Sequence, residues 1–431
     1  MIQEIRFKNF MSFKDEVKFS FEASNDKFAE DFQIVKINKT RLLRFAIIYG
    51  YNASGKTNML RVIQTLYDFW FGKPKDIDEK INIIPFKLDK DSPIKPSEFE
   101  MIFYVGTTRY CYQLIVDQQH VLSEKLSYYK TTQPIVLFNR EFENGQSMVD
   151  FNPILKVSSA VKSEILVKCW KNMSFFTARN QVNTSIPLID AAKEWMKLTF
   201  METIHPITDL TRYAQRENPK DNELTNYVLD FLNNADFNIT DIKTDVISKP
   251  ISEKIVEMIL QTEDLSKEAK EHIKNEKSLK QFRTVFEHTV ENERGIEKYQ
   301  LASHEESRGT MRTFGIETAL YNALNQNAFL AIDELETSLH PKLLEKILYE
   351  YLKKKSYTQL LVTTHNDGLL DLVDDLIRKD SVWFTEKNKA GVTDLYKLTD
   401  FRGINRLSSI REAYRNKRFG ATMGNVWKKE N

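Results

Sequence analysis

The chain has 431 residues, and its 62 lysines and arginines against 61 aspartates and glutamates give a formal net charge of +1. Because the charges are balanced, no excess of basic residues favours binding to nucleic acid or to anionic membranes. A content of 41% hydrophobic and 12% aromatic residues excludes a mostly disordered chain. Two cysteines are too few for a disulfide framework or a cysteine-built zinc site, and no stretch reaches the roughly 18 apolar residues of a membrane span. We therefore expect a soluble, cytoplasmic protein.

Strand-like alternation predicts a hairpin in the first two dozen residues. The mostly apolar run 42–49 is typical of a strand buried on both faces in a parallel sheet. A helix is expected over 56–70, where Met59 and Ile63 lie on one apolar stripe. Alternating segments between 98 and 140, separated by polar turns, then predict an antiparallel meander.

Helical spacing of apolar residues predicts helices over 155–290, including a helical hairpin over 252–287. From residue 299 an α/β pattern returns. We expect helices at 308–325, from 341 and at 367–378, and strands at 328–332, 359–363, 381–386 and 393–398. Because alternating strands and helices favour a mainly parallel sheet, the two ends of the chain are expected to form one sheet, with the middle as an insertion.

Residues 50–57 read Gly-Tyr-Asn-Ala-Ser-Gly-Lys-Thr, which matches the phosphate-loop pattern G-x-x-x-x-G-K-[ST] directly between a predicted strand and a predicted helix. The backbone N–H groups of such a loop bind phosphate oxygens. Lys56 is predicted to reach the β- and γ-phosphates, and the Thr57 hydroxyl to ligate Mg²⁺. The residues predicted to bind the nucleotide here are Gly50, Asn52, Ala53, Ser54, Gly55, Lys56, Thr57 and Asn58.

Two acidic residues follow the predicted strand 328–332. Asp333 is predicted to hold Mg²⁺ through its water shell, and Glu334 to act as the base that orients the attacking water. His365 follows the next strand, 359–363, from which its ring can hydrogen-bond the γ-phosphate. Paired acids or a lone histidine at a strand end often have no such role, but the phosphate loop in the same chain favours the functional interpretation.

Ser307 precedes the predicted helix 308–325 and is expected to cap it. Together with Gly309 and the N-terminus of the helix, Ser307 also predicts an anion site. Nothing in the neighbouring residues shows which copy of the chain would supply the phosphate.

The motifs GYNASGKT, ESRGT, FLAIDE, TSLHP and VTTH, in this order, resemble those of the ATP-binding-cassette (ABC) ATPases, specifically the SMC/RecF/OLD-like branch. The resemblance implies an α/β fold, an ABC-type P-loop ATPase head with a mixed, mainly parallel sheet, carrying a β-meander and a helical insertion. It assigns Ser307 and Gly309 to the signature motif, Ser338 to the D-loop and His365 to the switch histidine. It also implies that two copies bind two molecules of ATP with Mg²⁺ between them.

Residues 379–403 and 414–420 are similar to the C-terminal end of the bacterial AbiLi/RloA-type ATPases of abortive-infection and restriction-linked loci. This resemblance implies a homodimer, or a higher even-numbered oligomer, that controls a separate effector encoded at the same locus, a toxin or a nuclease. Slow, partner-regulated ATP hydrolysis is expected of such a switch. The alternative is a RecF/SMC-like DNA-binding repair or recombination ATPase, so nucleic acid stays open as a partner. A built-in Toprim nuclease is not expected, because no D-x-D pair follows Glu386.

The expected organisation has five parts. They are an N-terminal part of the ATPase head over 1–78, a β-rich arm over 79–150, a helical, partner-docking insertion over 151–298, a C-terminal part of the head over 299–400 and a tail over 401–431.

Overall fold

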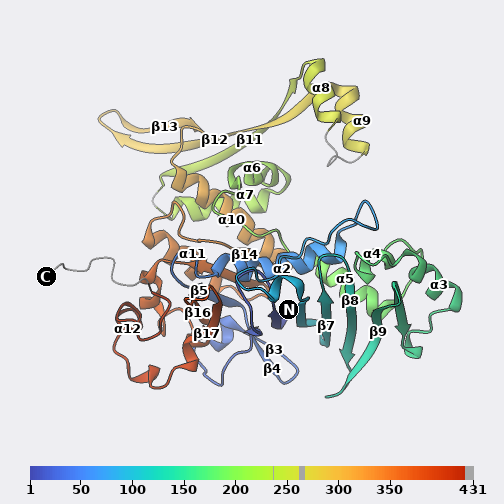
Figure 1. Ribbon diagram of the computed structural model, residues 1–431. Coiled ribbons are helices and arrows are strands. Elements are labelled where there is room, and N and C mark those ends of the chain that lie inside the picture. The colour runs from blue at the N-terminus through green and yellow to red at the C-terminus, as the bar shows by residue number, and fades with distance from the viewer. Residues whose placement is uncertain (236, 262–266, 423–431) are drawn as a thin grey trace. The chain divides into compact units, whose positions relative to one another are not determined.

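The computed structural model describes residues 1–235, 237–261 and 267–422 (Figure 1). The end of the predicted tail, from residue 423 on, lies outside the described residues. The chain forms two compact units, which divide it differently from the five parts expected above. The first unit contains Met1–Pro206, Ala323–Thr337 and Ile347–Asn431, and the second contains Ile207–Asn322 and Ser338–Lys346.

A five-stranded sheet forms the centre of the first unit. Its strands are β5 (Phe45–Tyr49), β14 (Phe329–Ile332), β15 (Gln359–Thr364), β16 (Val382–Lys387) and β17 (Thr393–Lys397). They follow the order β14–β15–β5–β16–β17, in which the first four are parallel and β17 is antiparallel to β16. Every residue of β5, β14 and β15 is buried, as expected of apolar strands inside a parallel sheet. The prediction that the two ends of the chain form one mainly parallel sheet is confirmed.

The second sheet of this unit is antiparallel and contains the predicted hairpin and meander. Its strands are β1 (Ile2–Lys8), β2 (Val17–Ser20), β6 (Ser97–Val105), β7 (Thr108–Val116), β8 (Val121–Tyr129), β9 (Pro134–Glu143) and β10 (Gln146–Phe151). The order β10–β9–β8–β7–β6–β1–β2 joins the hairpin to the edge of the meander through β1 and β6. The alternation of apolar and polar residues therefore predicted both parts correctly.

Helices cover these sheets within the first unit. They are α1 (Glu30–Gln33), α2 (Lys56–Phe71), α3 (Ser159–Lys168), α4 (Phe175–Arg179), α5 (Pro187–Thr199) and α12 (Ile410–Arg415). Trp70 of α2 stacks on Phe176 of α4 with ring centroids 3.9 Å apart, and Phe19 of β2 lies 4.9 Å from Trp383 of β16. Burying such side chains stabilises a fold by about 1.5–3 kcal/mol each. Both sheets thus share one hydrophobic core.

Two boundaries in this unit differ from the prediction. The run 42–49 is divided between β4 (Thr40–Leu43), which pairs with β3 (Ile34–Ile37), and β5. Arg44 separates the two strands, and its buried guanidinium donates to the carbonyls of Phe32 and Lys354. The predicted helix 367–378 is wrong, because only a 3₁₀ helix forms over Asp367–Leu372 and Asp374 then has φ +75°. A left-handed residue at that point ends the helical path.

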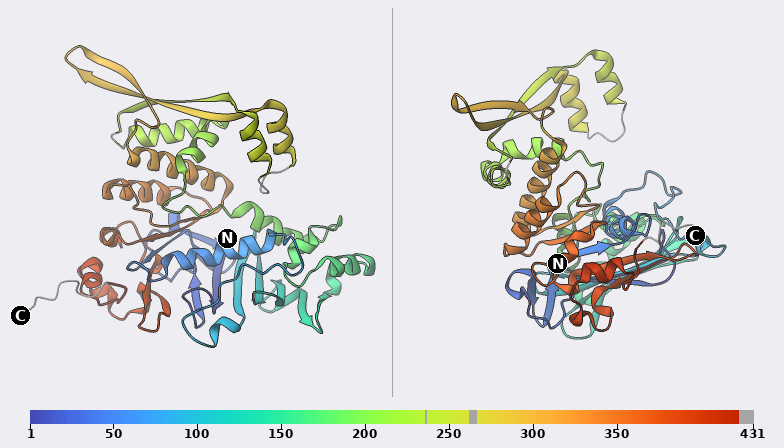
Figure 2. Two further views of the ribbon diagram at one scale, coloured as in Figure 1. Left: turned by 45° about the horizontal axis from the view of Figure 1, so that its top comes forward. Right: turned by 90° about the vertical axis from the view of Figure 1, so that its left-hand side faces the viewer.

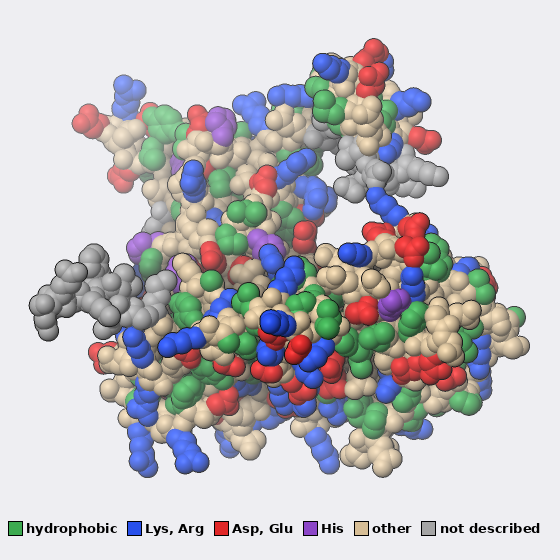
Figure 3. All heavy atoms as spheres, in the orientation of Figure 1, with side chains coloured by type: hydrophobic (Ala, Val, Ile, Leu, Met, Phe, Trp, Pro, Cys, Tyr) green, Lys and Arg blue, Asp and Glu red, His purple; other side chains and the backbone are tan. Residues whose placement is uncertain are grey.

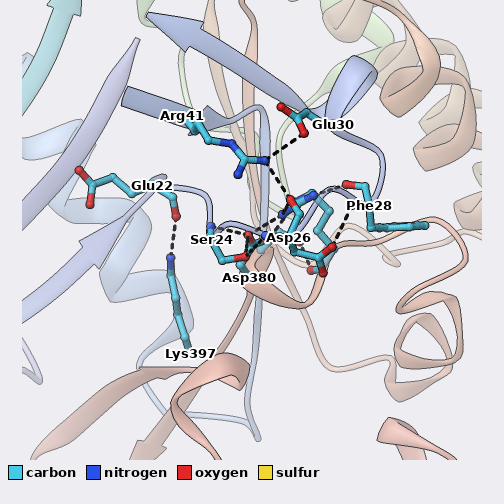
Figure 4. Close-up of polar contacts among 10 residues, drawn as sticks. Glu22, Ser24, Asp26, Phe28, Glu30, Arg41, Asp380 and Lys397 are labelled. Atoms are coloured by element: carbon cyan, nitrogen blue, oxygen red, sulfur yellow. Dashed lines mark hydrogen bonds and ion pairs between the residues drawn. The ribbon is translucent and has the colours of Figure 1, made fainter. Parts of the chain in front are cut away.

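A polar network connects the N-terminal part of the chain to the segment before β16 (Figure 4). The backbone N–H and the hydroxyl of Ser24 both donate to Asp380 Oδ2 at 2.7 Å, and Arg378 donates to both oxygens of the same carboxylate. Burial raises the pKa of Asp380, but the hydrogen bonds from Arg378 and Ser24 outweigh burial and hold that pKa below its usual value. The buried carboxylate is therefore charged, and both of its oxygens accept hydrogen bonds.

The second unit contains helices and a separate antiparallel sheet. Its elements are α6 (Leu210–Glu217), α7 (Asn222–Asn233), β11 (Ile239–Pro250), α8 (Glu253–Leu260), α9 (Lys267–Glu276), β12 (Ser278–Asn292) and β13 (Gly295–Ala302). The sheet has the order β11–β12–β13 and forms a long twisted ribbon with α8 and α9 near one end (Figures 1 and 2). Phe286 of β12 packs against Phe314, with ring centroids 5.3 Å apart. Phe314 lies on α10 (Arg308–Gln326), which begins in this unit and ends in the first, as does α11 (Pro341–Lys353).

The helical prediction for 151–298 is correct up to α7 and only partly correct beyond it. The segment predicted as a helical hairpin over 252–287 contains the short helices α8 and α9 and most of β12. The adjacent residues Val246 and Ile247 of β11 are 51% and 37% exposed, so neither face of this strand end is fully buried. Without a buried face there is no strict alternation in the sequence, and the Glu- and Lys-rich composition favoured helix.

The surface carries charges of both signs. On the face shown in Figure 3, lysine and arginine side chains are interspersed with aspartate and glutamate. In the described ranges of the chain, none of the helices combines the length and the apolarity needed to cross a membrane.

Candidate nucleotide-binding site

The predicted phosphate loop lies between the buried strand β5 and the helix α2. Gly55 has φ +114°, a conformation open to glycine, and a Cβ there would lie 2.6 Å from a methyl carbon of Thr393. A Cβ on Gly50 would collide with the side chain of Thr385. Both glycines of the motif are therefore required by the close packing of the loop against β16 and β17.

Side chains of the loop and of the following helix turn are held by hydrogen bonds. Ser54 Oγ lies 2.7 Å from Thr385 Oγ1, and the Thr393 hydroxyl donates to the Ser54 carbonyl at 2.9 Å. Asn58 Nδ2 donates to Ser12 Oγ at 2.8 Å. These partners come from β16, β17 and the N-terminal hairpin. The sequence interpretation missed all three, since only the fold brings them to the loop.

The predicted phosphate-binding lysine is buried and points back into its own loop. Lys56 Nζ donates to the carbonyls of Gly50 at 2.9 Å and Tyr51 at 3.4 Å, and the residue is 5% exposed. Burial lowers the pKa of Lys56, and the carboxylates that follow β14 partly oppose this effect. Asn52 and Ala53, at the tip of the loop, are exposed. The backbone at the tip of the loop is thus accessible. Lys56, beside it, can exchange its bonds to the loop carbonyls for bonds to phosphate oxygens.

The two predicted metal ligands meet in the structure. The Thr57 hydroxyl, in the first turn of α2, donates to Asp333 Oδ2 at 2.8 Å. The other carboxylate oxygen accepts a hydrogen bond of 2.5 Å from the hydroxyl of Thr363 on β15. Asp333 is 3% exposed. This buried carboxylate is therefore oriented from both sides.

These two side chains fit a magnesium ion. Mg²⁺ is held in proteins by one or two side-chain oxygens, with phosphate oxygens and water completing its shell. Thr57 and Asp333 supply a hydroxyl and a carboxylate at adjacent positions. Among the residues that the structure describes, no cluster of three or more His, Cys, Asp or Glu side chains could hold a metal by itself. The arrangement suits an ion that arrives with a nucleotide.

The predicted base and the predicted switch histidine lie at the ends of neighbouring strands. Glu334 has φ +49°, and its N–H donates to Thr363 Oγ1 at 2.9 Å. The side chain of His365 is 52% exposed, and its Nδ1 lies 2.8 Å from Oε1 of Glu336. Glu336 did not enter the predicted site, although it stands only three residues after Asp333.

In the second unit, the predicted signature and D-loop residues are neighbours. Ser307 caps α10, since its Oγ accepts from the Thr310 N–H at 3.0 Å. A Cβ on Gly309 would lie 3.1 Å from the carbonyl oxygen of Ser338. Ser338 has φ +63°, and both serines are exposed. Both serines thus lie at the surface of this unit, and the Ser307 hydroxyl also lies 2.8 Å from Thr310 Oγ1.

The structure adds a histidine that spacing alone could not identify. The segment 200–204 runs parallel to β14, with Ile204 opposite Ile332, and Asp333 N donates to the Ile204 carbonyl at 2.8 Å. His205 follows this segment, and its Nδ1 lies 3.8 Å from Asp333 Oδ2. Its position depends on strand pairing across more than one hundred residues, which no local motif reveals.

The C-terminal helix α12 is bound close to the predicted switch histidine, His365. Arg411 and Arg415 both donate to the carboxylate of Asp367, and Arg411 also donates to Asp371 at 2.7 Å. Asp367 stands two residues after His365 and begins the 3₁₀ helix. The described part of the tail is therefore attached to the segment that follows His365.

A phosphate loop between a buried parallel strand and a helix, facing a carboxylate at the end of a second parallel strand, defines the class of P-loop nucleotide-binding proteins. Within this class, the chain belongs to the P-loop ATPase family described as "AAA domain, putative AbiEii toxin, Type IV TA system". The match to this family covers residues 45–163 and 205–371, more than half of the chain. It includes the phosphate loop and the strands β14 and β15, which Asp333 and His365 directly follow.

Comparison with curated proteins finds no match. Among solved structures, the chain is similar to the SMC head domain from Thermotoga maritima, with a TM-score of 0.42 and 12% identity over 92% of this chain and 98% of that one. It is also similar to an Smc head domain with an extended coiled coil, bound to the C-terminal domain of ScpA, from Pyrococcus furiosus. That match has a TM-score of 0.40 and 11% identity, over 97% and 98% of the two chains.

Proposed function

We propose that this protein binds Mg²⁺-ATP between two copies of itself and hydrolyses ATP slowly, as a switch that controls a separate effector. The phosphate loop of one copy holds each nucleotide, and Ser307, Gly309 and Ser338 of the other copy cover it. The effector is a toxin or a nuclease encoded at the same locus, in bacterial defence against phage.

The hydrogen bond between Thr57 and Asp333 is the observation that carries the ATPase proposal. These residues stand 276 positions apart in the sequence, and the fold places their oxygens 2.8 Å apart at the mouth of the phosphate loop. A structural role alone would not require a buried carboxylate at that place, since burying a charge has a cost that only its partners offset. Membership of a P-loop ATPase family supports the same conclusion.

In the proposed reaction, a water molecule attacks the γ-phosphorus of ATP and its proton passes to the Glu334 carboxylate. The bond between the γ-phosphorus and the bridging oxygen breaks, which leaves ADP and phosphate. Lys56 and the N–H groups of the loop balance the negative charge of the phosphates. Bound magnesium, held by Thr57 and Asp333, would neutralise charge that develops on the β- and γ-oxygens.

The defence role rests on two supports of different kinds. The family carries a description that names a putative toxin and a toxin–antitoxin system. The C-terminal segments 379–403 and 414–420 resemble those of AbiLi/RloA-type ATPases. A switch benefits from a long-lived closed state, so we expect a turnover number well below the usual enzyme value of about 10 s⁻¹.

The test is the solution mass of the Glu334→Gln protein, by light scattering, with and without Mg²⁺-ATP and after co-expression with its genomic neighbour. We expect an ATP-dependent dimer that contains the neighbour, because the variant binds ATP without hydrolysing it. Lys56→Ala is the matched control and should stay monomeric under all conditions. A solution mass that does not change when Mg²⁺-ATP is added would contradict the ATP-dependent dimer. Normal hydrolysis by Glu334→Gln would contradict the assignment of Glu334 as the base. A strongly salt-dependent affinity for DNA would favour a repair ATPase over a switch.

A further inference from the structure

The side chain of Glu336 is attached to His365 by two contacts through one oxygen. Its Oε1 accepts a hydrogen bond from the His365 backbone N–H at 2.7 Å and lies 2.8 Å from Nδ1 of the ring. Only 10% of the Glu336 side chain is exposed, against 52% of the His365 side chain. One side of the imidazole is thus held by a nearly buried carboxylate, while the rest of the ring stays accessible.

The backbone around Glu336 is also fixed to the end of β15. Leu335 N donates to the Thr363 carbonyl at 3.1 Å, and Thr337 N donates to the Glu334 carbonyl at 3.0 Å. The turn that carries Glu336 is therefore tied on both sides. A carboxylate on such a turn loses little freedom when it binds a neighbour, which makes the contact with His365 well ordered.

The second oxygen of Glu336 has no partner of its own. Within residues 1–235, 237–261 and 267–422, Oε2 is buried without a hydrogen bond, and so is the hydroxyl of Tyr49. Burial raises the pKa of Tyr49 well above its usual value, and the charge of Glu336 adds to this effect. A buried carboxylate with so few partners has a cost in stability, so its retention calls for a role beyond packing.

We propose that Glu336 is a positioning residue that holds the His365 ring with Nδ1–H toward its carboxylate, so that Nε2 is the nitrogen that meets the γ-phosphate. A histidine nitrogen that donates to a carboxylate fixes both the tautomer and the orientation of the ring. A ring protonated on both nitrogens can donate to Glu336 and to a phosphate oxygen at once. This inference rests on the ATPase function proposed above and adds a residue to it.

The first test reads the tautomer and needs no hydrolysis. Nitrogen NMR of ring-labelled protein, at a pH where the ring is neutral, distinguishes protonation at Nδ1 from protonation at Nε2. The chain has seven histidines, and the signal missing in His365→Gln identifies the one of interest. We expect the Nδ1–H form in the wild type and in Glu336→Gln, which keeps an acceptor, and the Nε2–H form in Glu336→Leu. An unchanged tautomer in Glu336→Leu would overturn the proposal.

The second test measures single-turnover hydrolysis and ATP affinity in the same variants. We expect Glu336→Leu to lose about 10- to 100-fold in the rate, by analogy with the effect of removing the outer partner of a metal-ligating histidine, with ATP affinity almost unchanged. Glu336→Gln should lie between the wild type and Glu336→Leu. Glu164→Gln, at an exposed glutamate paired with Lys168, is the control and should match the wild type.

The double variant Glu336→Leu/His365→Gln separates positioning from an independent role. If Glu336 acts through His365, the double variant is no slower than His365→Gln alone. If the rate losses of the two single variants multiply in the double variant, the proposal is overturned. A loss of ATP affinity in Glu336→Leu as large as its loss of rate would also overturn it. A wild type that does not hydrolyse ATP would contradict the function proposed above, and the tautomer measurement would still decide the role of Glu336.

Discussion

The substitution Thr363→Val tests whether the proposed metal-binding function of the Asp333 carboxylate depends on the orientation of that carboxylate. Valine keeps the shape of threonine, and Thr363 is fully buried, so the change removes a hydroxyl without opening a cavity. That hydroxyl donates to Asp333 Oδ1 at 2.5 Å and accepts from the Glu334 N–H at 2.9 Å. A hydrogen bond to a charged group contributes about 1.5–3 kcal/mol and a neutral one about 1 kcal/mol, so the free energy of unfolding should fall by about 2.5–4 kcal/mol.

The functional effect should exceed what this loss of stability explains. The Asp333 carboxylate would lose one of the hydrogen bonds that orient it. We therefore expect the affinity for Mg²⁺-ATP to fall about 10- to 100-fold, as it does when other residues that orient metal ligands are replaced. Titration calorimetry with a non-hydrolysable ATP analogue gives the affinity, and urea unfolding gives the stability. Thr358→Val is the matched control, since its buried hydroxyl donates to the Ala323 carbonyl at 2.9 Å, away from the site. Equal weakening of nucleotide binding in both variants would refute the reasoning.

Three further changes have defined outcomes. Lys56→Ala should lower ATP affinity by at least about 10- to 100-fold in a binding titration, because charge-assisted hydrogen bonds to the phosphates are lost. Gly55→Ala should abolish binding, since φ is +114° and the new Cβ would lie 2.6 Å from a methyl carbon of β17; Gly106→Ala, at φ +57° with open space around it, should bind normally. The folded-state pKa of Asp380 is lowered, so the stability from its contact with Arg378 is present above about pH 4 and lost as pH falls further. In acid unfolding, the stability of Asp380→Asn should lack the pH-dependent contribution that the contact with Arg378 makes in the wild type.

The sequence predicted those features whose cause is local. The phosphate loop needs its glycines, lysine and threonine at fixed spacing between a strand and a helix, and the structure has that context around residues 50–57. The core strands were recognisable because parallel strands buried on both faces are short apolar runs. Amphipathic stripes predicted α2 and α10 to within about one residue, because each buries one face.

What the sequence could not show depends on contacts between distant segments. Thr363 and His205 are ordinary residues until strand pairing places both beside Asp333. The ribbon β11–β12–β13 was misread in part because exposed positions such as Val246 and Ile247 weaken its alternation. Its signal was the frequency of β-branched residues, Thr, Val and Ile, which favour strands over helices.

The position of β5 in the core sheet has a consequence for how the protein is made. This strand carries the phosphate loop, and its two neighbours are β15, which begins at Gln359, and β16, which begins at Val382. At typical rates of synthesis the ribosome needs about 20 to 70 s after β5 to make both neighbours. Until then an apolar strand lacks its partners on both edges, which is a setting for aggregation or chaperone binding. The nucleotide-binding site can therefore form only after β16 has been made, more than 330 residues after β5.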